Sequence, residues 1–146
     1  MALLLVAYCG TASAAEAIQV NPFDDPFLEV TRGMPSCPQP KPPAMTAAEA
    51  RGEAHVRVER GTRCYMDGHC RLPNAYRYDA EIIPRVKKAI LADGRFGDTA
   101  VWALGQRRWV FLQGCVRSRA QSQALEKLVR GLDDVERVVN QLSVSR

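Results

Sequence analysis

The stretch RRWVFLQGCVRS, residues 107–118, decides the fold of this chain. It is apolar at four consecutive positions, Trp109 to Leu112. A strand covered on only one face alternates apolar with polar residues, so this strand is expected to carry apolar side chains on both faces. One face belongs to a core, and the other face needs a cover or a binding partner.

The segments around this strand predict alternating helices and strands. Residues 79–94 place apolar side chains along one side of a helix, which we expect to begin near Ile83 because Pro84 is tolerated in a first turn. A capping-box pattern, Ser118 with Gln121, opens a second helix. The remaining segments are strands at 99–105 and 108–116 joined by a turn at Gly105-Gln106-Arg107, the second helix closing at Gly131, and a strand at 138–144.

This order of elements resembles the BON domain, named for bacterial osmotic-stress and nodulation proteins. The resemblance covers about residues 79–146 and rests on Val110, Leu112 and Gly114 in a V-x-L-x-G strand, then Gly131, Val135, Val138, Asn140, Leu142 and Val144. It implies an α+β fold, an αββαβ sandwich with two helices on one face of a three-stranded sheet. Arg108 replaces the family's usual glycine and Leu132 its common valine, departures that bear on turn geometry more than on the fold.

The resemblance also assigns the two faces of the central strand. If Val110 and Leu112 point inward, Trp109 and Phe111 point to the opposite face, because strand side chains alternate. We expect the N-terminal extension to cover this aromatic face, and an open binding face is the alternative.

The first fifteen residues predict a secretory signal. An uncharged apolar run from Ala2 to Gly10 precedes the small-x-small pattern Ala12-Ser13-Ala14, with cleavage expected near Ala14 or Ala15. A short buried helix and a lipoprotein signal acylated at Cys9 are the alternatives. No other segment approaches the roughly 20 apolar residues of a membrane span, so we expect a peripheral or soluble mature protein.

Residues 16–78 lie outside the resemblance. Seven prolines mark residues 16–45 as an extended arm, in which Phe23 and Phe27 dock on a partner or fold back on the domain. Residues 46–78 predict a short helix, opened by the capping box of Thr46 and Glu49 and ended by Gly61, followed by a cysteine loop.

Four cysteines remain after the signal, and they allow three disulfide pairings. Cys64 and Cys70 bracket an Asp67-Gly68 turn that favours their pairing, which leaves Cys37 with Cys115. A zinc site using His55 and His69 is the competing interpretation, although the spacing matches no familiar zinc pattern.

Positive charge gathers in the second half of the chain. Residues 80–146 hold twelve Lys or Arg against seven Asp or Glu, whereas residues 16–79 hold eight against nine. Such an excess attracts anionic phospholipid headgroups, and a merely solubilising helix face is the alternative. The candidate lipid-binding residues are Arg85, Lys87 and Lys88, with Arg107, Arg108 and Trp109.

The sequence contains no catalytic, metal, cofactor or nucleic-acid motif. The resemblance implies a non-catalytic periplasmic protein, associated with the envelope and the outer membrane. Two hypotheses follow: binding of anionic phospholipid surfaces in support of envelope integrity, or an adaptor that docks another envelope or secretion protein through its arm or its aromatic sheet face. The partner and the oligomeric state stay open.

Overall fold

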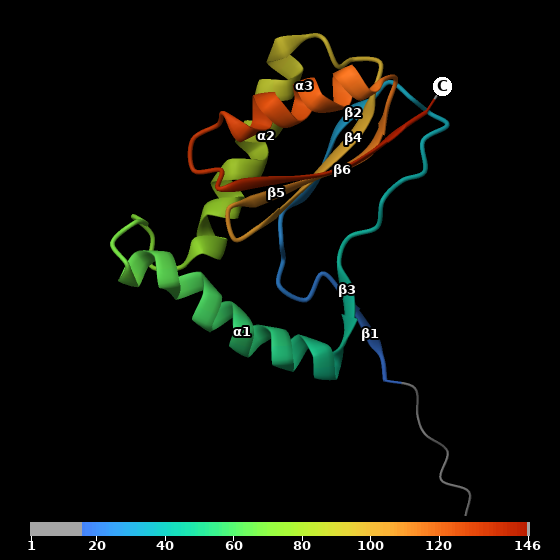
Figure 1. Cartoon of the computed structure of the whole chain (residues 1–146). Helices are drawn as coiled ribbons and strands as arrows, with labels where there is room; N and C mark the ends of the chain where they lie inside the picture. The colour runs from blue at the N-terminus through green and yellow to red at the C-terminus, as the bar shows by residue number, and fades with distance from the viewer. Residues whose placement is uncertain (1–15, 146) are drawn as a thin grey trace, which may run out of the picture.

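A computed structural model describes residues 16–145 (Figure 1). The predicted signal and the alternative acylation site at Cys9 lie outside the described residues. In chain order the elements are β1 (Ile18–Val20), β2 (Phe27–Arg32), β3 (Ala44–Thr46), α1 (Ala47–Met66), the 3-10 turn η1 (Ala75–Tyr78), α2 (Asp79–Asp93), β4 (Ala100–Gln106), β5 (Trp109–Val116), α3 (Arg119–Arg130) and β6 (Arg137–Val144). The predicted α+β class is confirmed.

The main sheet has four strands in the order β2-β4-β5-β6, so the expected three-stranded sheet is wrong. β2 comes from the arm and pairs antiparallel with β4. The arm was predicted to be extended and either to dock on a partner or to fold back on the domain. It folds back as this strand, which Pro26 and Pro35 flank instead of interrupting. β5 pairs antiparallel with β4 and parallel with β6. A small second sheet joins β1 and β3.

The core lies between this sheet and helices α2 and α3. Val110 and Leu112 of β5 are completely buried and belong to the cluster that contains Ile83 of α2 and Leu125 of α3. Burial of each such aliphatic side chain contributes about 1.5–3 kcal/mol. The inward direction predicted for Val110 and Leu112 is confirmed.

Gly114 completes this strand for a steric reason. Its φ of 113° is one that side chains rarely adopt, and a Cβ there would lie 2.0 Å from the carbonyl oxygen of Ala100 on β4. Only glycine permits this close pairing of β4 and β5.

The predicted end of the first helix at Gly61 and the predicted start of the second near Ile83 are both wrong. α1 continues to Met66 through Gly61, which is buried against Asn74: a Cβ at Gly61 would lie 2.4 Å from that side chain. Gly61 therefore allows α1 to pack closely against Asn74 and does not end the helix. α2 begins at Asp79 and contains Pro84, which removes one N–H bond to the carbonyl of exposed Ala80.

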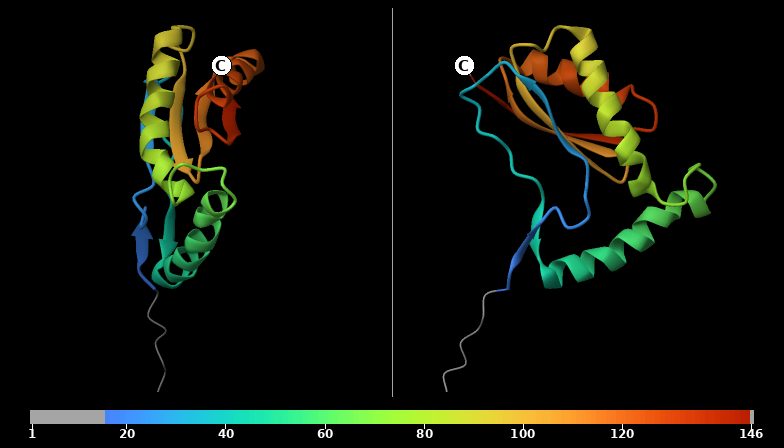
Figure 2. Two further views of the ribbon diagram at one scale, coloured as in Figure 1. Left: turned by 90° about the vertical axis from the view of Figure 1, so that its left-hand side faces the viewer. Right: turned by 180° about the vertical axis from the view of Figure 1, so that it is seen from behind.

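The arm covers part of the face opposite the helices. Met34 of the arm packs on Trp102 of β4 and on Cys115, and both are buried. Helix α1 does not pack flat on this face, although its Glu53 and Arg60 side chains line a hollow beside Trp109 and Phe111. It contacts β1, β3 and η1 and lies beyond one end of the main sheet (Figure 2). The expected cover is thus supplied by the arm at one end of the face.

Both predicted disulfides are present. Cys37–Cys115 joins the arm to β5, and Cys64–Cys70 closes the loop after α1. The zinc alternative is not supported, because these thiolates are used in disulfides.

The two disulfides are expected to differ in their contribution to stability. Replacing Cys37 and Cys115 by Ser opens a loop spanning 78 residues, which lowers the free energy of unfolding by about 4–5 kcal/mol on loop entropy. The same change at Cys64 and Cys70, with a separation of 6, is worth about 2 kcal/mol. Urea unfolding of both variants measures the difference. A larger loss from the short loop would contradict the role assigned to the arm.

Candidate functional site

The β4–β5 hairpin turn separates the predicted basic residues. Arg107 and Arg108 form the turn with φ values of 59° and 65°, the left-handed region that normally favours glycine or asparagine. The turn therefore lies one residue later than predicted. Arg108 adopts the conformation that the glycine usual at this position would allow without strain.

A buried carboxylate holds this turn. Asp79, the first residue of α2, is 1% exposed and accepts hydrogen bonds from the backbone N–H groups of Arg107 at 2.7 Å and Arg108 at 2.8 Å. Burial raises the pKa of Asp79 to about 7, although the two amides act in the opposite direction. Nothing in its sequence context distinguishes this residue from an ordinary N-terminal helix acid.

Arg108 turns into the domain. Its Nε donates to the carbonyl oxygen of Asp134 at 2.8 Å, and its Nη1 lies 3.2 Å from Cys70 Sγ. Its guanidinium also lies over the ring of Tyr78, 5.2 Å from the ring centroid. Its contacts are thus structural, and the predicted lipid-binding role of Arg108 has no support from its orientation.

Arg107 and Trp109 lie together on the other face. The guanidinium of Arg107 lies 4.7 Å from the Trp109 ring centroid, and Arg137 of β6 lies 4.6 Å from the same centroid. Cation–π contacts of this kind orient the guanidinium and leave its N–H groups free to bind an anion. Arg137 was not among the predicted binding residues, although its place one residue before inward-facing Val138 indicates an outward side chain.

The three predicted cations of α2 do not form one patch. Arg85 donates to the carbonyl oxygen of Asp133 at 2.6 Å and lies 3.6 Å from the Asp134 carboxylate. The ion pairs formed within residues 16–145 leave Lys87 and Lys88 without a carboxylate partner.

An apolar side chain accompanies the two lysines. Leu91 is 53% exposed and stands three and four residues after Lys88 and Lys87, so all three share one side of α2. Leu91 was not among the predicted binding residues, although an apolar residue off the apolar stripe of a helix indicates an exposed apolar side chain.

A buried ion pair fixes α1 beside the hairpin. Arg57 of α1 bonds both carboxylate oxygens of Asp25, which also accepts from Gln106 of β4 at 2.6 Å. The Arg57 guanidinium is stacked between the rings of Phe23 and Tyr76, at 4.1 and 4.3 Å from their centroids. Phe23 of the arm therefore packs against its own chain.

The outer face, which is the face of the main sheet opposite α2 and α3, is hollowed where it adjoins α1. A cavity of about 380 Å³ lies between α1 and the sheet, lined by Glu53, Arg60, Tyr76, Gln106, Arg107, Trp109 and Phe111. A second of about 200 Å³ adjoins it and shares Arg60 and Arg107. Within residues 16–145 no cluster of side chains suited to a metal ion is found, and none of the helices has the length and apolar character of a bilayer span.

The pH dependence of stability tests the buried carboxylate. Because the folded pKa of Asp79 lies above its ordinary value, ionisation disfavours the folded state, and the free energy of unfolding is expected to fall as the pH rises from about 4 to about 7. Asp79→Asn is expected to lack this component. Urea unfolding of both proteins at about pH 5 and about pH 8 measures it. Identical pH responses would show that Asp79 ionises normally.

Comparison with known proteins locates the fold. No curated protein matches the chain. The family model of the BON domain matches residues 78–146, which begins at the residue before α2 and includes β4, β5, α3 and β6. The predicted resemblance, placed at about residues 79–146, is confirmed within one residue. Residues 78–146 of this chain are therefore similar to the BON domain family.

Proposed function

We propose that this protein is a non-catalytic component of the bacterial envelope whose BON domain binds anionic phospholipid surfaces through α2. The match to the BON family indicates an envelope or osmotic-stress related domain of a phospholipid-binding type, in a family that is generally non-catalytic. Two disulfides fit an exported, periplasmic protein. Peripheral association with the outer membrane, in support of envelope integrity, is part of the proposal.

The observation that carries the lipid contact is the exposed side of α2. Lys87 and Lys88 provide two ammonium groups that form no ion pair among the described residues, although Lys87 also attracts the Glu29 carboxylate of β2. Exposed Leu91 provides an apolar side chain beside them. Each lysine contributes roughly 1 kcal/mol at an anionic surface, and salt weakens that attraction. An apolar group flanked by lysines is suited to the headgroup boundary of a bilayer.

The second candidate function is a protein-interaction adaptor. The structure disfavours docking of a partner through the arm, because Phe23 already stacks on Arg57 and Phe27 already packs against the cluster of Met34 and Trp102. The outer sheet face is the surface that favours this candidate.

Vesicle flotation tests the lipid proposal. Replacing Lys87 and Lys88 by Ala is expected to weaken binding to vesicles containing phosphatidylglycerol by about tenfold or more, since two charges of about 1 kcal/mol each are lost. Binding of the native protein should require the anionic lipid and should decrease with salt.

The matched control replaces Lys41 of the arm and Lys127 of α3 by Ala. It removes the same charge from two exposed positions away from Leu91. If both variants lose vesicle binding equally, the effect depends on net charge and not on the position of the lysines. If the native protein binds neutral vesicles only, the proposal has no electrostatic basis.

A further inference from the structure

Two buried polar atoms on the outer face of β5 lack a hydrogen-bond partner within the described chain. They are the indole Nε1 of Trp109, a donor, and Oε1 of Gln113, an acceptor. The two residues are four positions apart on one strand, so their Cα atoms are separated by roughly 13 Å on the same face. Buried unpaired polar groups cost about 1–3 kcal/mol each, so the presence of two of them on one face of β5 needs an explanation.

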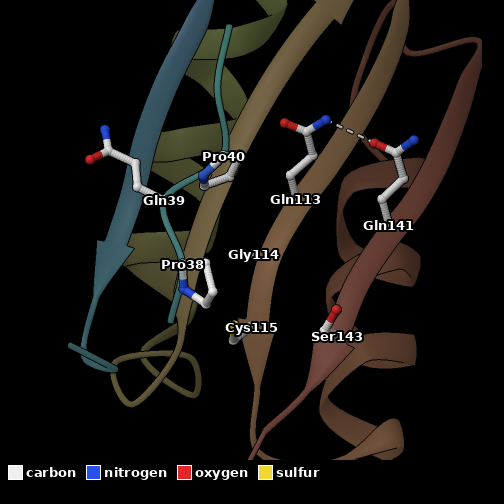
Figure 3. Close-up of a pocket in the computed structure, with 8 residues that line it drawn as sticks. All are labelled: Pro38, Gln39, Pro40, Gln113, Gly114, Cys115, Gln141 and Ser143. Carbon is white, nitrogen blue, oxygen red and sulfur yellow. Dashed lines mark hydrogen bonds between the residues drawn. The ribbon is translucent and has the colours of Figure 1, made fainter. Parts of the chain in front are cut away.

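The surroundings of Gln113 explain why the chain itself does not pair its oxygen. The Gln113 amide nitrogen donates to Oε1 of Gln141 on β6 at 2.9 Å. Figure 3 shows the Gln113 oxygen turned away from Gln141 toward the arm, where Pro38 and Pro40 stand. Prolines carry no N–H group, so these two residues cannot donate to it, and Gln39 between them makes no hydrogen bond to it. A hollow of about 310 Å³ lies here between the arm and the sheet.

The other end of the strip carries positive charge. Arg107 and Arg137 lie against Trp109, and Arg60 of α1 lines the same hollow as Arg107 and Trp109. None of these three guanidinium groups takes part in an ion pair with a carboxylate of the described residues. Guanidinium groups without an ion-pair partner, beside a half-buried aromatic ring, bind carboxylates well.

The region between these ends is apolar. Phe111 and Val139 are paired neighbours on β5 and β6 and are half-buried. We call the outer strip the surface made by Trp109, Phe111 and Gln113 of β5 with Arg137, Val139 and Gln141 of β6. It combines a donor, an apolar centre, an acceptor and a cationic end.

Both edge strands of the main sheet carry features that hinder pairing with an added strand. A partner is therefore expected to bind the outer face instead of an edge. On edge strand β6, the side chain of Asn140 accepts from the backbone N–H of Leu142 at 3.1 Å and is itself held by Ser122. On edge strand β2 the pairing register shifts between Glu29 and Thr31. Such features discourage strand addition.

We propose that the outer strip binds an extended segment of a partner protein that carries an acidic residue. An extended backbone offers carbonyl and N–H groups along its length. The Trp109 indole nitrogen and the Gln113 oxygen are buried in the unbound chain, so these two side chains must turn outward to pair with such a backbone. An acidic side chain pairs with Arg107 and Arg137. The chain's own residues 1–15 contain no acidic residue, and a lipid acyl chain has no donor for Gln113. The proposal is independent of the α2 contact with phospholipid.

Peptide titration of the full chain, followed by NMR, tests the proposal. The probes are the blocked peptide acetyl-TVEVTV-amide and the analogue with Gln in place of Glu. The Glu peptide is expected to shift the Trp109 indole N–H and the Gln113 amide resonances, with an affinity about tenfold above that of the Gln peptide. No shift at millimolar peptide would overturn the proposal.

Matched variants locate the site. Arg107→Gln with Arg137→Gln should lose the preference for the Glu peptide, whereas Arg117→Gln with Arg119→Gln, which removes equal charge elsewhere, should keep it. Gln113→Leu should weaken both peptides. Thermal melting checks that each variant is folded. Equal peptide binding by the Arg107 and Arg137 variant would contradict the proposal.

Two further outcomes would assign the strip to another occupant. Shifts of the same resonances on concentrating the protein alone would make it an interface between copies. Shifts with phosphatidylglycerol vesicles, lost in the Arg107 and Arg137 variant, would make it a membrane surface. Failure of the Lys87 and Lys88 variant to lose vesicle binding would instead refute the lipid proposal and leave this one standing.

Discussion

The alternation of side chains along β5 is the constraint on which the rest of the structure depends. Val110 and Leu112 are fully buried beneath α2 and α3, so the neighbouring side chains must occupy the opposite face. Cys115 shares that face, and its disulfide to Cys37 brings the proline-rich arm onto it. One strand thus fixes which face forms the core, where the extension lies and which aromatic residues stay half-exposed.

The turn of the β4–β5 hairpin places its two arginines on opposite faces of the sheet, so the domain has two separate surfaces. Asp79 holds Arg107 and Arg108 in left-handed conformations, and their side chains leave the turn toward opposite sides. Arg108 reaches Cys70 and the loop after α3, whereas Arg107 lies on Trp109. The helix side presents the lysines of α2, and the outer side presents arginines around an aromatic ring. The two proposed contacts, with phospholipid and with a partner protein, therefore use opposite faces of one small domain.

The sequence predicted what depends on local pattern. The V-x-L-x-G strand, the two capping boxes and the cysteine spacing led to the inward face of β5, the starts of α1 and α3 and both disulfides. Folding back of the arm was among the predictions, but its pairing with β4 as a fourth strand depends on a distant edge that local pattern does not reveal. The passage of α1 through Gly61 likewise depends on the distant packing of Asn74. Asp79 and the Arg57–Asp25 pair were missed for the same reason, since their partners lie far along the chain.

The central claim is that β5 turns its aliphatic side chains toward the helices and Trp109 away from them. Nuclear Overhauser contacts in the full-length protein, labelled at methyl groups and at tryptophan, measure this most directly. The account predicts contacts between Leu112 and the methyl groups of the buried cluster of α2 and α3, and contacts from the Trp109 ring to Arg137. Contacts from the Trp109 ring to Ile83 or Leu125, with none from Leu112, would contradict it.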